Sequence, residues 1–119
     1  MNQLQALLHD SLIRRKHVEN AAIIDIMERQ VCASTFGFNV RDQRATYYKL
    51  EGEDYFKEKY YKCVRADEHS IHVQNADGGL IVVKTKAFIL VATYRVGMYP
   101  SVCMEAVETL ADYFREKGS

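Results

Sequence analysis

The 119-residue chain contains no tryptophan, a single proline and only three cysteines, and its formal net charge is zero. Sixteen basic side chains balance sixteen acidic ones, so no long-range field draws the whole molecule to nucleic acid or to an anionic membrane. We therefore expect no nucleic-acid partner. Any binding to an acidic surface must come from a local group of basic residues.

The cysteines and the apolar segments also limit the class of protein. Cys32, Cys63 and Cys103 are odd in number and lie far apart without C-x-x-C spacing, which favours reduced thiols in an intracellular protein over a disulfide framework. Polar residues interrupt the first ten positions, so we expect no signal peptide. No apolar run approaches the roughly 20 residues of a membrane span.

The side chains that could carry catalysis are few and badly spaced for it. His69 and His72 point to opposite faces of an extended strand, and no acidic or thiolate ligand has matching spacing. We interpret them as solvent-facing histidines of a turn and expect no metal site. Cys103 lies on an apolar helical stripe and is expected in the core, and Gly78-Gly79 lacks the Lys-Ser/Thr pair of a phosphate loop. We therefore expect neither an enzyme nor a cofactor.

The last third of the chain carries the clearest structural pattern. Leu80–Val83 and Ala87–Tyr94 read as an antiparallel hairpin, and the second run lacks alternation, which indicates a central strand covered on both faces. Pro100 suits the first turn of a helix, and Gly118 suits its end. Apolar residues at helical spacing predict that this helix, over residues 100–117, buries one stripe, formed by Cys103, Ala106, Val107, Leu110 and Phe114.

The first third predicts a helix followed by a hairpin. Asn2 can cap a helix over residues 2–15, in which Leu4, Leu7, Leu8 and Leu12 recur on one face. Ala21–Met27 and Val31–Ser34 read as two strands joined by a polar turn.

The middle of the chain predicts the remaining strands. Tyr55-Phe56 and Tyr60–Ala66 read as a further hairpin, and in Ser70–Gln74 the apolar residues alternate with polar ones, so that strand is half exposed. The chain is thus expected to form one domain over residues 1–119, an α/β fold of the α+β type. About six or seven strands form one antiparallel sheet, with both terminal helices on one face.

Several short segments recur in the order found in one known family. GGLIVVKT (78–85) precedes a hydrophobic strand ending in Tyr94, then MYPSVC (98–103), then a helix containing LADY (110–113). This arrangement resembles the profilin family. Three segments most resemble its divergent testis-type subgroup: Cys63–Ser70, Leu90–Tyr94 and Gly97–Ser101.

The resemblance implies a second helical layer that this chain shortens. Profilins carry short helices on the sheet face opposite the terminal helices, whereas only residues 41–54 are available for them here. One such helix is expected to be missing or cut short. Tyr47, Tyr48 and Leu50 could replace its cover, and their spacing leaves open whether they form a helical turn or an irregular loop.

The resemblance also implies a proline-rich ligand groove that has lost its rings. Profilins bind polyproline on aromatic side chains between the terminal helices. Leu4 and Leu7 stand where the family usually has Trp and Tyr, and Cys32 stands where it usually has Trp. Only Tyr113 keeps a ring, so polyproline binding is expected to be weak or lost. The competing interpretation makes Leu4 and Leu7 core residues.

The actin-facing surface of profilins implies four contact candidates, namely Lys62, Arg65, Lys84 and Lys86. The shortened middle removes part of that surface, so the resemblance implies weakened binding to actin monomers. Surface lysines that are merely solvated are the competing interpretation.

Three groups of basic residues could hold acidic phospholipids, phosphoinositides in particular. Arg14, Arg15 and Lys16 close the first helix, Arg115 and Lys117 close the last, and Lys84 and Lys86 form a separate patch at a hairpin tip. The sequence leaves open whether the two helix-end clusters lie side by side.

We therefore expect a cytoplasmic, cytoskeleton-associated, monomeric and non-catalytic protein that binds acidic phospholipids. A scaffold subunit of the roadblock or longin type is the alternative, since it uses the same layout to pair an edge or an uncovered face with an unknown protein partner. Mass in solution separates the two, because the scaffold predicts a tight dimer.

Overall fold

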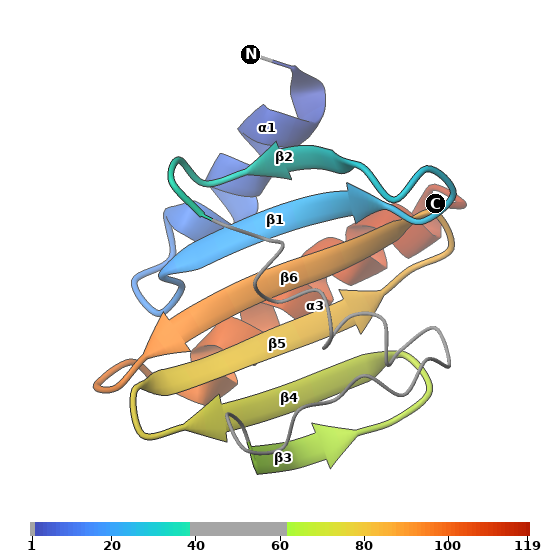
Figure 1. Cartoon of the computed structure of the whole chain (residues 1–119). Helices are drawn as coiled ribbons and strands as arrows, with labels where there is room; N and C mark the ends of the chain where they lie inside the picture. The colour runs from blue at the N-terminus through green and yellow to red at the C-terminus, as the bar shows by residue number, and fades with distance from the viewer. Residues whose placement is uncertain (1, 39–61) are drawn as a thin grey trace.

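The computed structural model describes residues 2–38 and 62–119. In this part the chain forms one six-stranded antiparallel sheet with the order β2-β1-β6-β5-β4-β3 (Figure 1). The six strands are β1 (Asn20–Asp25), β2 (Val31–Ser34), β3 (Lys62–Ala66), β4 (Ser70–Asn75), β5 (Gly78–Lys84) and β6 (Phe88–Arg95). The predicted antiparallel sheet is confirmed, with six strands.

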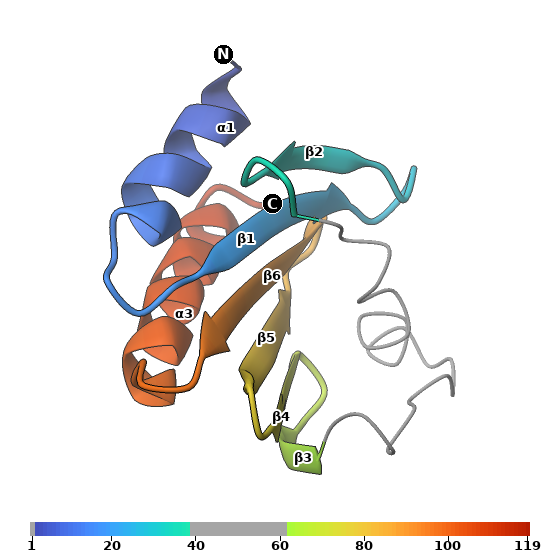
Figure 2. The same ribbon diagram turned by 60° about the vertical axis from the view of Figure 1, so that its left-hand side comes forward.

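Both terminal helical segments cover the same face of this sheet, as predicted (Figure 2). They are α1 (Gln3–Leu8), its π-helical continuation η1 (His9–Ile13) and α3 (Pro100–Glu116). The sequence predicts a uniform helix over 2–15, but the Arg14 N–H donates to the His9 carbonyl, five residues back, which is the wider turn of a π-helix.

Strand β6 lies inside the sheet, between β1 and β5. Leu90 and Ala92 belong to the hydrophobic cluster under the helices, and Ile89 and Val91 belong to a second cluster on the opposite face. Both sides of the strand are therefore buried, which explains why its sequence lacks alternation. The predicted central strand is confirmed.

The second cluster shows that the face opposite the helices is also buried. Its members are Ala22, Ile24, Ile71, Val73, Leu80, Val82, Ile89 and Val91. The predicted alternation of β4 is confirmed, because Ile71 and Val73 are buried on this face. The predicted cover by Tyr47, Tyr48 and Leu50, the shortened helical segment and the Tyr55-Phe56 strand lie outside the described residues.

The ends of the helices follow the local signals. The Asn2 side chain accepts the Gln5 N–H at 2.7 Å and caps α1, as predicted. Pro100 opens α3, where its missing N–H costs no hydrogen bond. Gly118, at a φ of 78°, closes it in the left-handed conformation.

None of the described helices combines the length and the apolar character that a membrane span requires.

Candidate lipid-binding and partner-binding surfaces

The basic cluster that ends the first helical segment lies beside the beginning of α3. Arg15 pairs with Glu105 of α3 at 3.8 Å, and Arg14 pairs with Asp10 at 3.6 Å. These are exposed ion pairs, which contribute little stability but offset much of the local positive charge. Of the three cations at residues 14–16, only Lys16 takes no part in an ion pair within the described residues.

His17 fixes this cluster against the amino-terminal end of α3. Its Nδ1 accepts the backbone N–H of Tyr99 at 2.9 Å, and its ring stacks on the Tyr99 ring with centroids 4.9 Å apart. Tyr99 is the residue that precedes the first turn of α3. The cluster at 14–16 therefore belongs to the starting end of α3.

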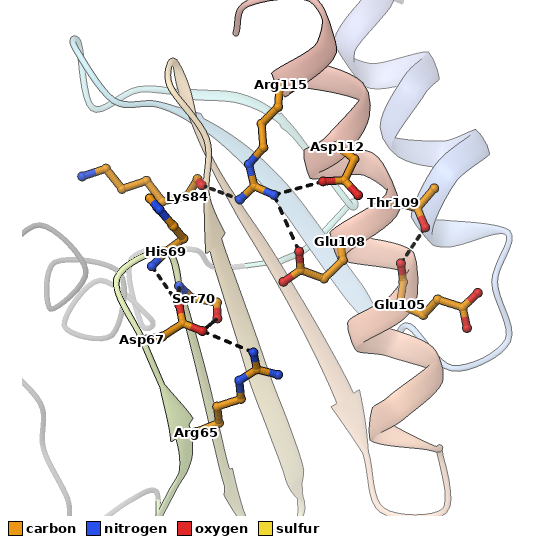
Figure 3. Close-up of polar contacts among 10 residues, drawn as sticks. All are labelled: Arg65, Asp67, His69, Ser70, Lys84, Glu105, Glu108, Thr109, Asp112 and Arg115. Atoms are coloured by element: carbon orange, nitrogen blue, oxygen red, sulfur yellow. Dashed lines mark hydrogen bonds and ion pairs between the residues drawn. The ribbon is translucent and has the colours of Figure 1, made fainter.

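Arg115 lies near the opposite end of α3 and connects this helix to the sheet (Figure 3). Its Nη2 donates to the Lys84 carbonyl at 3.0 Å, while its Nη1 lies 3.2 Å from an Asp112 oxygen and 3.7 Å from a Glu108 oxygen. Two carboxylates thus offset one guanidinium. Arg115 therefore connects α3 to β5, and little of its positive charge is available to a ligand.

The turn between β5 and β6 is tied to the same end of α3. Thr85, only 4% exposed, donates its hydroxyl to the Ser119 carbonyl at 2.8 Å, and the Ala87 N–H donates to the same oxygen. Lys84 and Lys86 flank Thr85, and Lys117 lies two residues before Ser119. We call the group Lys84, Lys86, Arg115 and Lys117 the carboxyl-terminal corner.

The structure thereby groups the predicted basic residues differently from the sequence. Arg115 is ten residues beyond Glu105, the partner of Arg15, which is about 15 Å along a helix. The cluster at 14–16 therefore stands apart from Arg115 and Lys117. Lys84 and Lys86, expected as a separate patch, join Arg115 and Lys117 instead.

The three lysines of the carboxyl-terminal corner have different neighbours from those of Arg115. Within the described residues, none of the ion pairs includes Lys84, Lys86 or Lys117. The Lys117 ammonium lies 5.1 Å from the centre of the Tyr113 ring, a cation–π contact that leaves its charge in place. In the described part of the chain, the corner consequently holds three positive charges without a paired carboxylate.

The candidate actin contacts lie toward the same end of the sheet. The Lys84 N–H donates to the His69 carbonyl in the turn between β3 and β4, and Arg65 pairs with Asp67 of this turn at 3.4 Å. Figure 3 shows Arg65, His69 and Lys84 along one side of the molecule. Of Lys62, only the backbone in β3 belongs to the described part.

Asp67 organises that turn. Its carboxylate accepts the His69 and Ser70 N–H groups, both at 2.8 Å, and the Ser70 hydroxyl at 3.1 Å. These bonds, that from His69 first, lower the pKa of Asp67.

The residues of the predicted polyproline groove are partly brought together. Leu4, Leu7 and Cys32 are partly buried and pack against the hydrophobic cluster under the helices. Tyr113 is 42% exposed and meets Phe114 of that cluster edge to face, with ring centres 5.7 Å apart. The two leucines thus serve as packing residues, and one aromatic ring of the set remains accessible.

His72 corrects the interpretation of the histidines as solvent-facing turn residues. It lies in β4, partly buried, and its Nε2 is 2.6 Å from the Tyr94 hydroxyl, which also donates to Gln74 at 3.3 Å. Burial lowers the pKa of His72, and burial followed by the nearby Cys103 thiol raises that of Tyr94. His69 is exposed in the turn, as predicted.

The sequence did not indicate this contact because the partners are two strands apart. Tyr94 of β6 is paired with Gly79 of β5, which is paired with Gln74 of β4. Since Gly79 has no side chain, the Tyr94 ring crosses β5 and reaches β4. A glycine paired with an aromatic residue of the neighbouring strand indicates such a contact, but this pairing can be recognised only once the strand register is known.

Two observations concern the side chains that could carry chemistry. No group of three metal-binding side chains occurs in residues 2–38 and 62–119. Cys103 is fully buried, and burial raises its pKa to about 12, so its thiolate is scarce at neutral pH. The prediction that Cys103 belongs to the core is confirmed.

One antiparallel sheet with both terminal helices on one face defines a small α+β domain of the profilin-like class. Acanthamoeba castellanii profilin IA has a similar architecture: it superposes with a TM-score of 0.84 at 26% identity, and the match covers 98% of this chain and 100% of that one. A roadblock/LC7 domain from Streptomyces avermitilis shares the fold with a TM-score of 0.62 at 20% identity, covering 95% and 99% of the two chains.

The chain belongs to the profilin family. The model of the Profilin family matches residues 2–119, and Profilin-4 of Bos taurus is 50% identical over the whole of both chains. The subgroup expected from the three sequence segments is thereby confirmed. Profilins are cytoskeletal actin-binding proteins without enzymatic activity.

Proposed function

We propose that this profilin-family protein is a cytoplasmic, cytoskeleton-associated, non-catalytic protein that binds acidic phospholipids, phosphoinositides in particular, through the carboxyl-terminal corner. The observation that carries the proposal is the grouping of Lys84, Lys86 and Lys117 at one end of the molecule, where none of them has a paired carboxylate among residues 2–38 and 62–119. A multiply charged phosphate head group is the ligand that such a set of ammonium groups attracts most.

The strength of this binding follows from the number of available charges. Each basic residue near an anionic surface contributes about 1 kcal/mol, so three lysines give about 3 kcal/mol, or roughly a hundredfold in partitioning. Arg115 adds little, because Asp112 and Glu108 offset its charge. Because the net charge of the chain is zero, no global attraction adds to this, and salt should weaken the binding quickly.

Co-sedimentation with phosphatidylcholine vesicles, with and without a phosphoinositide, tests the proposal at low and at physiological salt. The triple substitution of Lys84, Lys86 and Lys117 by Gln should lower partitioning by roughly a hundredfold. The matched control replaces Arg14, Arg15 and Lys16 by Gln, which changes the net charge by the same amount and should leave partitioning nearly unchanged.

Two outcomes contradict this assignment. Loss of binding only in the control variant would move the lipid site to the beginning of α3. If the unmodified protein stays in the supernatant with phosphoinositide vesicles at low salt, the lipid proposal fails as a whole.

Binding to other profilin ligands is proposed to be weak. Arg65, Lys84 and Lys86 remain as contacts for an actin monomer. Lys84 and Lys86 also belong to the carboxyl-terminal corner, so actin and the acidic phospholipid should compete for them. Membership of the family supports actin as a partner. A groove that holds Leu4, Leu7 and Cys32 in place of rings supports weak or absent polyproline binding.

The scaffold alternative rests on the fold shared with a roadblock domain. The scaffold requires a sheet edge or face that pairs with another chain, so the mass of the protein in solution distinguishes it from a monomeric lipid-binding protein. A monomer that sediments with phosphoinositide vesicles supports our proposal, and a tight dimer indifferent to lipid supports the scaffold.

A further inference from the structure

The outer edge of β2 is occupied by side chains of the first helix. Gln5 of α1 donates its Nε2 to the Ser34 carbonyl at 2.8 Å and accepts the Ser34 N–H on its Oε1 at 3.2 Å. Asn2 donates its Nδ2 to the Cys32 carbonyl at 3.4 Å. One primary amide thus binds both backbone groups of one residue, as a neighbouring strand would do.

These backbone groups are the ones that point away from the sheet. The Thr35 N–H donates inward, to the Ala21 carbonyl of β1 at 2.9 Å, and the backbone groups of successive strand residues face opposite directions in the ladder. Ser34 therefore faces outward, where an edge strand normally offers unpaired groups to another chain.

The two edges of the described sheet are protected by different means. Strand β3 carries Arg65 and a register irregularity between Cys63 and Arg65, with Val64 half exposed. Charges and bulges of this kind discourage pairing with another strand. Strand β2 reads Val-Cys-Ala-Ser, with neither a charge nor a proline, so its own sequence offers no comparable protection.

We propose that the first turn of α1 is a releasable cover for β2, and that the uncovered edge pairs antiparallel with β2 of a second copy of this chain. A two-fold pairing places the same strand opposite itself, and an uncharged strand meets no like-charge repulsion there. Release requires the first turn of α1 around Gln5 to open and Leu4 to leave its partly buried contact with the hydrophobic cluster, while Leu8 and Leu12, further along, stay fully buried as anchors of the segment.

Substitution of Gln5 by Met tests the cover, since Met keeps the length and the helix propensity of the side chain but forms neither hydrogen bond. Gln3→Met is the matched control, because Gln3 is exposed on the same helix. Hydrogen exchange at the Ser34 amide should be about five- to tenfold faster in dilute Gln5→Met than in the unmodified protein or in Gln3→Met.

Sedimentation across a concentration series then tests the second copy. Gln5→Met should form a dimer as concentration rises, with the Ser34 amide protected again in the dimer, while the unmodified protein and Gln3→Met stay monomeric. Adding Ser34→Lys to Gln5→Met should abolish the dimer, because it places a lysine in the pairing edge of both copies, and charged side chains of this kind keep edge strands from pairing.

The inference is overturned if Ser34 exchanges equally fast in Gln5→Met and in the unmodified protein. It is overturned as well if Gln5→Met stays monomeric at every concentration, or if the dimer persists with Ser34→Lys. Vesicle binding by the carboxyl-terminal corner is a separate measurement, so failure of one proposal leaves the other readable.

Discussion

Replacing Gly79 by Ala should destabilise the protein through a single steric conflict. A Cβ at this position would lie 2.2 Å from the Tyr94 hydroxyl oxygen and 2.3 Å from the ring carbon that carries it. Real Cβ contacts are not this short, so the ring must move. Tyr94 is only 5% exposed and its hydroxyl is bound to His72 and Gln74, which leaves the ring little room.

The expected cost combines overpacking with lost hydrogen bonds. Overpacking in a well-packed core costs about 1–3 kcal/mol, and each of the two hydrogen bonds of the Tyr94 hydroxyl contributes about 1 kcal/mol. The sum of about 3–5 kcal/mol is a large share of the roughly 5–15 kcal/mol that stabilises a typical domain. For a chain of this size it corresponds to a fall in Tm of roughly 12–20 °C.

A double-mutant cycle with Tyr94→Leu isolates the conflict. In that background the ring and its hydroxyl are gone, so Gly79→Ala should be neutral or stabilise by about 0.5–1 kcal/mol, since alanine loses less backbone entropy than glycine. The assay is urea unfolding of the four proteins, followed by circular dichroism. If Gly79→Ala costs the same in both backgrounds, the Tyr94 ring is not the cause and the reasoning fails.

Other predictions follow from the same structure. Burial lowers the pKa of His72. The contribution of this residue to the free energy of unfolding should therefore be at its full value above about pH 6.5, its pKa in the unfolded chain, and should fall as the pH drops below that value. His72→Gln should flatten this dependence, as measured by urea titrations at about pH 7.5 and about pH 5.5. With Ellman's reagent, the exposed Cys63 should react rapidly and the buried Cys103 only on unfolding, and equal rates would contradict the described core. Calorimetry with decaproline should show weak binding or none, and low-micromolar affinity would refute it. A pyrene-actin assay should show only partial inhibition of nucleation, and full inhibition near equimolar protein would show that the shortened middle does not matter.

The fold could be predicted because its signals are local. The alternation in β4, the unbroken apolar run of β6 and the stripe on α3 each report which faces of one element are buried. Asn2, Pro100 and Gly118 mark helix ends by backbone chemistry that acts within a turn. None of these signals needs information on what packs beside them.

The candidate binding surfaces could be predicted only in part, because they depend on contacts between residues that are far apart in the sequence. The Gln5 amide meets Ser34, twenty-nine residues away, and the His72 ring meets the Tyr94 hydroxyl across an intervening strand. Polar side chains of this kind have no periodicity of their own. Their partners follow from strand order and register, which the sequence does not state.

The basic residues show what this difference means for function. The sequence offers seven candidate cations for an acidic head group, but Arg14, Arg15 and Arg115 are each paired with a carboxylate, and Arg115 also holds the Lys84 carbonyl. An ion pair must be broken before its cation serves a ligand, which cancels much of the gain. The lysines of the carboxyl-terminal corner have no ion pair to break among the residues that the structure describes. Binding that rests on so few charges should therefore be reversible by modest changes in salt or in the phosphate content of the membrane.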